Sequence, residues 1–339
     1  MTQSVPMSLV PSPGGLSAER RLQIYDLMLR ARVLEERLIS MYKQGDGFFW
    51  IGGPGEEAFN VPLGLLVDKG QGVDHDYLHL HYRSSGTLLA MGGDPVDSLR
   101  QMRNTATDPY SKGRNFAGHY SVRKWNIVPV TSPIEVQFSI AIGTARAQRK
   151  AKGITIVQGG DAGTAEGDFA TALVWSSRKG AELPMLMIVT NNRYGISTPF
   201  AGQHGYDQIA DRGKAFNMPT AVIDGNDPEA SYAALTTAMD YVRTERKPYL
   251  LEAMVSRLRG HSSASGANLV KTEIDCIERF ETQLEAAKLL TREQMTARRD
   301  AHTAELLEAS RQIRNEPAPE PSQIWEHVFA DKNLVGGEG

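Results

Sequence analysis

The chain has 339 residues, of which 41% are hydrophobic and 23% charged, so it can bury a sizeable core. Its formal net charge of -3 lacks the electrostatic footprint of a nucleic-acid-binding protein, and no apolar run approaches the roughly 18 residues of a membrane span. The single cysteine, Cys276, excludes an internal disulfide and a cysteine-based metal site. We expect a globular, cytoplasmic protein that binds neither nucleic acid nor membranes.

The first predicted element is a long helix. Residues 1–16 before it carry several prolines and glycines, show no signal-peptide pattern, and are expected to form a flexible arm. Ser17 is a candidate N-cap, and the helix should continue to about Tyr42 before Gly45 ends it. Its expected buried face carries Leu27, Leu34, Leu38 and Met41. We expect residues 17–339 to form one domain, with a helical, proline-rich extension from about residue 275.

An aromatic patch follows this helix and leads into a flexible, glycine-rich turn. Phe49 and Trp50 belong to the patch, and the turn spans residues 52–57. Aromatic side chains in such a position more often belong to the core than to the wall of a ligand site.

Two clusters on predicted loops carry candidate binding residues. The segment from His79 to Arg83 has the histidine count of a metal site, but no cysteine or Glu-x-x-His pattern accompanies it, and Arg83 would repel a cation. Tyr82 and Arg83 are better suited to bind an anion. Residues 131–134 (Thr-Ser-Pro-Ile) open a helix, and they suit equally a cofactor wall and an N-cap with proline at the first helical position.

The segment 158–198 resembles a cradle for a metal-bound diphosphate. An apolar run ends in a turn with glycines at positions 159, 160 and 163, whose N–H groups can hold phosphate oxygens. Asp161 would repel a phosphate, which favours a divalent cation between them, and Mg²⁺ prefers such oxygen ligands. A second apolar run ends at Asn191 and Asn192, and packing explains paired asparagines poorly. The Asn192 side chain and a carbonyl near Tyr194 would complete the metal ligands.

Strands and helices alternate through the second half of the chain. Apolar segments at 220–223 and 248–255 enclose a helix at 228–246, which predicts a doubly wound, mainly parallel α/β sheet flanked by helices. Ligands bind at the carboxyl ends of the strands in such sheets, where the cradle and the loop 257–266 both fall. A lone histidine is usually structural, but His261 in this loop is well placed for a proton donor or anion clamp.

In combination and in order, these motifs resemble the α-subunits of thiamine diphosphate-dependent 2-oxo acid dehydrogenases. The cofactor motif is Gly160-Asp161-Ala162 followed by Asn191-Asn192. The other elements are His81-Tyr82-Arg83, Thr131-Ser132-Pro133-Ile134 and Arg257-x-x-Gly260-His261-Ser262. The segments 49–57 and 165–168 are more similar to branched-chain members than to pyruvate members.

The resemblance implies the thiamine diphosphate-binding fold, with an N-terminal helix, a C-terminal helical extension and defined site residues. Mg²⁺ would be bound by Asp161, the Asn192 side chain and the Tyr194 carbonyl. The diphosphate would be held by Gly160, Ala162, Gly163, Tyr82 and Arg83, and the cofactor would be flanked by Ser132, Ile134 and Ile196. His261 would assist proton or group transfer, and Phe49 and Trp50 would face the substrate.

The resemblance also implies partners. The carboxylate that activates the aminopyrimidine ring belongs to a separate β-subunit in this family, so an α2β2 assembly is expected. The substrate would be a 2-oxo acid, expected to be branched, and the acyl group would pass to a lipoyl-bearing acyltransferase core. A pyruvate or acetoin dehydrogenase α-subunit is the alternative enzyme, and a non-catalytic scaffold or regulatory homologue is the alternative of another class.

Two departures from the family pattern stand out. Ala162 replaces the usual third glycine of the turn, and its methyl group is expected to be tolerated if the backbone φ is negative. The loop after His261 lacks the acidic and Tyr-Arg elements common in the family, so a shorter lid is expected.

Overall fold

The computed structural model describes residues 15–326 and 328. The expected flexible arm, 1–16, lies almost entirely outside the described residues. Within them, no helix combines the length and the apolar character that crossing a membrane requires.

A five-stranded parallel sheet forms the centre of the described structure. Its strand order is β1-β2-β3-β7-β6, and every neighbouring pair is parallel. The strands are β1 (Tyr77–His79), β2 (Thr155–Gly160), β3 (Met185–Asn191), β6 (Thr220–Asp224) and β7 (Tyr249–Met254). The predicted α/β sheet is thus confirmed. Strand β1 was missed, because the segment from His79 was assigned to a loop and its three residues are too short for an alternation pattern.

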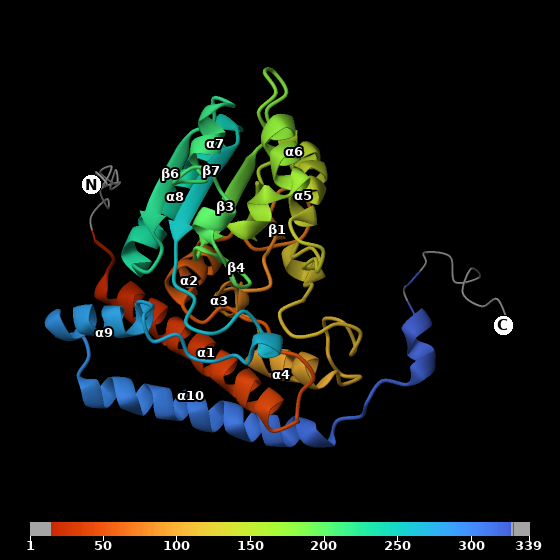
Figure 1. Ribbon diagram of the computed structural model, residues 1–339, viewed down its shortest axis with the longest axis vertical. Coiled ribbons are helices and arrows are strands. Elements are labelled where there is room, and N and C mark those ends of the chain that lie inside the picture. Colours follow the sequence, from red (N-terminus) through yellow and green to blue (C-terminus); the bar gives the residue numbers. More distant parts are fainter. Residues whose placement is uncertain (1–14, 327, 329–339) are drawn as a thin grey trace.

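Helices cover both faces of the sheet, and the alternation of side chains along β3 explains how. Ile188 packs into the apolar cluster that includes residues of α2 and α8, while Val189 packs into the cluster of α5 and α6. Figure 1 shows α5 and α6 at one flank of the sheet and α8 at the other. These helices are α2 (Glu57–Leu66), α5 (Val136–Ala147), α6 (Gly167–Ser176) and α8 (Pro228–Glu245).

The two ends of the described chain form a further helical layer. Helix α1 (Ala18–Lys43) begins at the predicted N-cap, where the Ser17 hydroxyl accepts the Arg20 N–H at 3.2 Å. It packs with α9 (Cys276–Ala286) and α10 (Arg292–Gln312) around a separate apolar cluster, and Figure 1 shows α1 and α10 side by side below the sheet. The remaining elements are α3 (Ser85–Ala90), α4 (Pro95–Arg103), α7 (Asp211–Lys214) and the hairpin strands β4 (Tyr194–Gly195) and β5 (Thr198–Pro199).

One expected helix start is wrong. Helix α5 begins at Val136, so Pro133 does not occupy its first position, and Glu135 precedes the helix with a left-handed φ of 63°. A non-glycine residue at positive φ costs energy that surrounding contacts must offset. The segment 131–134 is therefore a loop, which excludes the N-cap interpretation.

A buried ionic cluster joins the N-terminal and C-terminal helices. Arg32 of α1 donates from Nε to Glu57 Oε1 at 2.6 Å and from Nη1 to Asp275 Oδ2 at 2.6 Å. Arg32 and Glu57 are buried. The Cys276 thiol donates to the same Glu57 carboxylate at 3.3 Å, which gives the single cysteine a structural contact. Removing one member of such a cluster leaves an uncompensated charge in the core.

We predict that Arg32→Ala lowers the free energy of unfolding by about 3–5 kcal/mol, because Glu57 would remain buried without its cation. Urea denaturation measures this loss. Arg30→Ala, on the same helix, is the matched control, since its pair with Glu305 is solvent-exposed and should contribute less than about 1 kcal/mol. Equal losses in the two variants would contradict the prediction.

Candidate functional site

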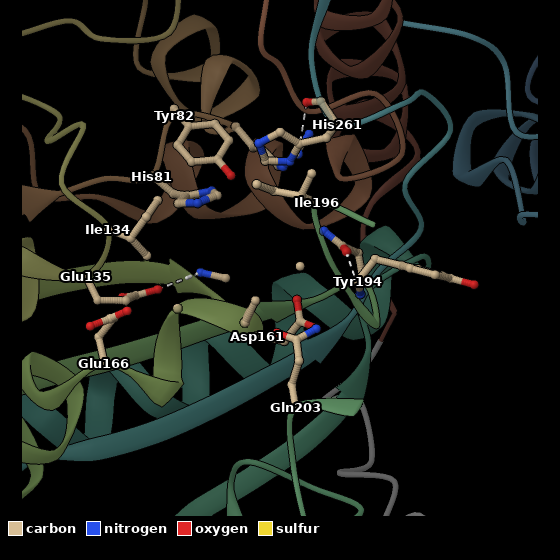
Figure 2. Close-up of a pocket in the computed structure, with 16 residues that line it drawn as sticks. His81, Tyr82, Ile134, Glu135, Asp161, Glu166, Tyr194, Ile196, Gln203 and His261 are labelled. Carbon is tan, nitrogen blue, oxygen red and sulfur yellow. Dashed lines mark hydrogen bonds between the residues drawn. The ribbon is translucent and has the colours of Figure 1, made fainter. Parts of the chain in front are cut away.

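A cavity of about 290 Å³ opens at the carboxyl ends of β2 and β3. The register explains this position, because Gly160 pairs with Thr190 and Asn191 pairs with Met254, so the ends of three strands lie at one edge. The cavity is lined by eleven of the predicted site residues, Tyr82, Arg83, Ile134, Gly160, Asp161, Ala162, Gly163, Asn192, Tyr194, Ile196 and His261. Figure 2 shows how the labelled members surround it.

Three predicted site residues do not line this cavity. Ser132 lies two residues before the lining residue Ile134, and Phe49 packs edge-on against Phe116 with ring centroids 4.9 Å apart. Trp50 is fully buried, and its indole N–H donates to Glu35 Oε2 at 2.7 Å. Trp50 is therefore a core residue in this structure, and a substrate contact does not follow from its position.

The cavity also has lining residues to which the sequence analysis assigned no role in binding. They are His81, Glu135, Glu166, Gly195 and Gln203. Glu135 is the most buried carboxylate among them, and its Oε1 accepts the Gly160 N–H at 3.1 Å. Burial raises the pKa of Glu135 to about 8, and the nearby carboxylate of Asp161 adds to that rise. Glu135 directly follows the segment 131–134, and no sequence pattern there indicated that its side chain would enter the cavity.

The carboxyl group of Asp161 is suited to a cation. Its side chain is buried, and Oδ2 makes no hydrogen bond within the described part of the chain. Burial raises the pKa of Asp161, as expected of a carboxylate that lacks a compensating charge. Asn192 and Tyr194 line the same cavity, and the Asn192 side-chain oxygen accepts the Tyr194 N–H at 3.1 Å. A carboxylate, an amide oxygen and a backbone carbonyl are the kinds of oxygen ligand that Mg²⁺ prefers, and the residues that carry them line one cavity.

The expected tolerance of Ala162 has a geometric basis. The backbone of Ala162 does not have a positive φ, so its methyl group causes no backbone strain. A side chain at Gly195 would collide with this methyl group. The glycine of the β4 hairpin thus provides the space that Ala162 needs.

Arg83 contacts His261 within the lining of the cavity. Its Nη1 donates to the Gly52 carbonyl, its Nη2 lies 3.2 Å from His261 Nδ1, and its Nε lies 3.8 Å from a carboxylate oxygen of the buried Glu56. A guanidinium group can only donate, so Nδ1 accepts and the proton of the neutral imidazole resides on Nε2. Burial, followed by the charges of Arg83 and Arg257, lowers the pKa of His261 to about 4. The arrangement holds a neutral histidine in one tautomer.

The loop after His261 closes on itself. Ser262 is buried, its hydroxyl accepts the Ala264 N–H at 3.3 Å, and its own N–H donates to Ser265 Oγ at 3.1 Å. These bonds form a capping box around the 3-10 turn Ser263–Ser265. The loop is thereby ordered through its own side chains.

Comparison with known protein families matches residues 25–322 to the dehydrogenase E1 component. The chain belongs to this family. Its members depend on thiamine diphosphate, so the resemblance noted in the sequence is confirmed at the level of the family.

Individual relatives are similar over nearly the whole chain. The protein named 2-oxoisovalerate dehydrogenase subunit alpha in Bacillus subtilis (strain 168) is 29% identical over 326 residues, which cover 93% of this chain and 97% of the relative. The mitochondrial 2-oxoisovalerate dehydrogenase subunit alpha of Bos taurus is 28% identical over 327 residues, covering 93% and 70%. The mitochondrial subunit alpha 2 of Arabidopsis thaliana is 28% identical over 325 residues, covering 93% and 67%.

We predict that His261 titrates near pH 4 in the folded chain, against its ordinary value of 6.5. Between these two values the unfolded chain binds a proton that the folded chain does not, so His261 lowers stability as the pH falls through this window. Nitrogen-15 NMR of labelled histidine measures the midpoint and the Nε2–H tautomer. Arg83→Met should raise the midpoint, because it removes a nearby positive charge. A midpoint near 6.5 in the unmodified chain would refute the assignment.

Proposed function

We propose that this chain is the α-subunit of a decarboxylase component that acts on a branched-chain 2-oxo acid with thiamine diphosphate and Mg²⁺. The observation that carries the proposal is the buried, unpartnered Asp161 oxygen in a cavity lined by Asn192 and Tyr194. The relatives named for 2-oxoisovalerate support the branched-chain substrate. An alternative substrate, pyruvate or acetoin, would require only a different pocket shape.

The residues of this chain divide the work of binding. Asp161, the Asn192 side chain and the Tyr194 carbonyl would hold Mg²⁺, which offsets the charge of a diphosphate. Tyr82 and Arg83 would hold the diphosphate itself, since a guanidinium group suits phosphate oxygens. When bound, thiamine diphosphate supplies the electron sink that lets a 2-oxo acid lose carbon dioxide.

His261 would serve as a hydrogen-bond donor in the site. Its neutral form, with Nδ1 occupied by Arg83, leaves the Nε2–H as the free donor. A neutral imidazole can donate this hydrogen bond to a polar group of the substrate without adding a positive charge. The low pKa of His261 keeps this state unchanged across physiological pH.

Exposed apolar side chains in the lining of the cavity indicate that a partner subunit binds there. Ile134, Tyr194 and Ile196 are 48%, 41% and 61% exposed, although two of them are aliphatic and all three line the cavity. Helices α5 and α6 also carry exposed apolar side chains, Ile140 and Trp175. Such a surface next to a binding site is typical of a protein interface. We propose that a β-subunit covers it in an α2β2 assembly, with a lipoyl-bearing acyltransferase core as acyl acceptor and a cytoplasmic location.

Asp161→Ala should abolish Mg²⁺-dependent binding of thiamine diphosphate, because it removes the only carboxylate of the proposed ligand set. Calorimetry of the full chain with its co-purified β-subunit, with and without MgCl₂, measures the loss. The apo variant should unfold at the same or a higher temperature, since it loses a buried carboxylate oxygen that has no hydrogen bond within the described residues. Asp240→Asn, on the exposed side of α8, is the control and should bind normally. Retained affinity in Asp161→Ala would show that the metal assignment is wrong.

His261→Ala should reduce acyl transfer by roughly 100-fold or more, the usual magnitude for a positioned proton donor. Cofactor affinity should stay close to that of the unmodified protein. Transfer to a lipoyl domain and calorimetric affinity are measured on the same preparation. His75→Ala provides the control. His75 precedes the amino end of β1, whereas the cavity opens at the carboxyl ends of the strands, and it pairs with Asp68 at 3.3 Å. Full transfer activity in His261→Ala would remove this residue from the site.

A panel of 2-oxo acids separates the substrate alternatives. With the β-subunit present, carbon dioxide release should be faster with branched-chain 2-oxo acids than with pyruvate. Preference for pyruvate would favour the alternative enzyme. Failure to bind thiamine diphosphate with MgCl₂ in the presence of the β-subunit would favour the non-catalytic homologue.

A further inference from the structure

Glu135 lines the cavity in a backbone conformation that is unusual for a residue with a side chain. It stands between Ile134, which lines the cavity, and the first residue of α5, and its backbone adopts a left-handed φ of 63°. Its side chain is 1% exposed. Both the conformation and the burial of a carboxyl group cost free energy, so contacts nearby must offset them.

Those contacts are made with the turn that carries Asp161. Glu135 Oε1 accepts the N–H of Gly160 at 3.1 Å, while Oε2 makes no hydrogen bond within the described residues. The carboxyl group lies so close to Gly159 and Gly163 that a Cβ at either position would collide with it. Figure 2 shows the bond from Glu135 to the strand end beside the cavity.

This arrangement gives a different explanation for the glycines at positions 159 and 163. From the sequence, glycines 159 and 163 were assigned to the approach of a phosphate. In the structure the Glu135 side chain fills the space next to both of them. The Gly160 N–H is also already bonded, so the expected contribution of this N–H to diphosphate binding falls to the rest of the turn.

We propose that Glu135 is a positioning residue that fixes the Gly160–Asp161 turn relative to Ile134, with Gly159 and Gly163 as its required counterparts. The inference rests on the proposed cofactor site. Ile134 and Asp161 lie on different segments of the chain and line the same cavity, and the Glu135 side chain bonds one segment to the other at the Gly160–Asp161 turn. A cofactor held at both ends requires these two segments at a constant separation.

The pairing of a large side chain with two glycines makes a swap experiment possible. Glu135→Ala removes the bond that joins the Gly160–Asp161 turn to the segment of Ile134, and it should weaken binding of thiamine diphosphate with MgCl₂ by about tenfold, because the turn is no longer held in place. Glu135→Gln retains an oxygen acceptor of the same reach and should bind within about threefold of the unmodified protein. Gly163→Ala should weaken binding like Glu135→Ala, because the added methyl group displaces the carboxyl group.

The double variant Glu135→Ala with Gly163→Ala gives the sharpest outcome. The methyl group at 163 occupies space that the carboxyl group has vacated, so the second substitution should add no further loss to the first. Gly205→Ala is the control for glycine replacement, since open space surrounds a Cβ at that position. Affinities come from calorimetry on the full chain with its β-subunit, and thermal unfolding of the apo proteins is measured in parallel.

The outcomes separate the inference from the proposed function. Unmodified protein that binds no cofactor overturns the proposed function and the inference with it. Unmodified protein that binds, together with equal or tighter binding by Glu135→Ala, overturns the inference alone. A lower unfolding temperature without a change in affinity also overturns it, because the role would then be structural. If Glu135→Ala does not fold, full cofactor affinity in Gly163→Ala would also overturn the inference.

Discussion

The parallel register of β2, β3 and β7 is the constraint on which the rest of the site depends. It brings the last residues of three strands to one edge, so that Asp161 and Asn192 are near neighbours although they come from separate strands. A slip of two residues in either pairing would separate them by more than a metal-ligand set can span. The apolar clusters on the two faces of β3 hold this register, because each face packs against different helices.

The sequence was sufficient wherever a pattern extends over many residues. The long helix that begins at Ser17, the strands at the core and the strand-end residues Asp161 and Asn192 all follow from periodicity and from the chemistry of turns. Short or isolated features were not predictable. Strand β1 has three residues, and the bond from the Trp50 indole to Glu35 joins residues 15 positions apart, so no local pattern reveals it. Glu135 belongs to the same class, since its role depends on glycines more than twenty positions away.

Several ionisable side chains are buried in and around the cavity, in addition to the Arg32–Glu57 pair in the helical layer. Arg83 supplies a guanidinium group between the cavity and His261, while burial raises the pKa of Glu56 to about 8 and that of Glu135 to about 8. These groups are expensive to desolvate and contribute little to stability. Their retention at one strand edge is consistent with a site organised around an anion and a cation that neutralise each other.

The contact between α1 and α10 has a consequence for how the chain folds. The apolar face of α1 packs against α2, α3 and α4, but it is completed by helices that begin only at Cys276 and Arg292, so part of it has no partner while the central sheet is being synthesised. Contacts of such large sequence separation form late and slow folding. A nascent chain therefore exposes part of the apolar face of α1 until α9 and α10 have been synthesised, and a truncation before α9 would make that exposure permanent.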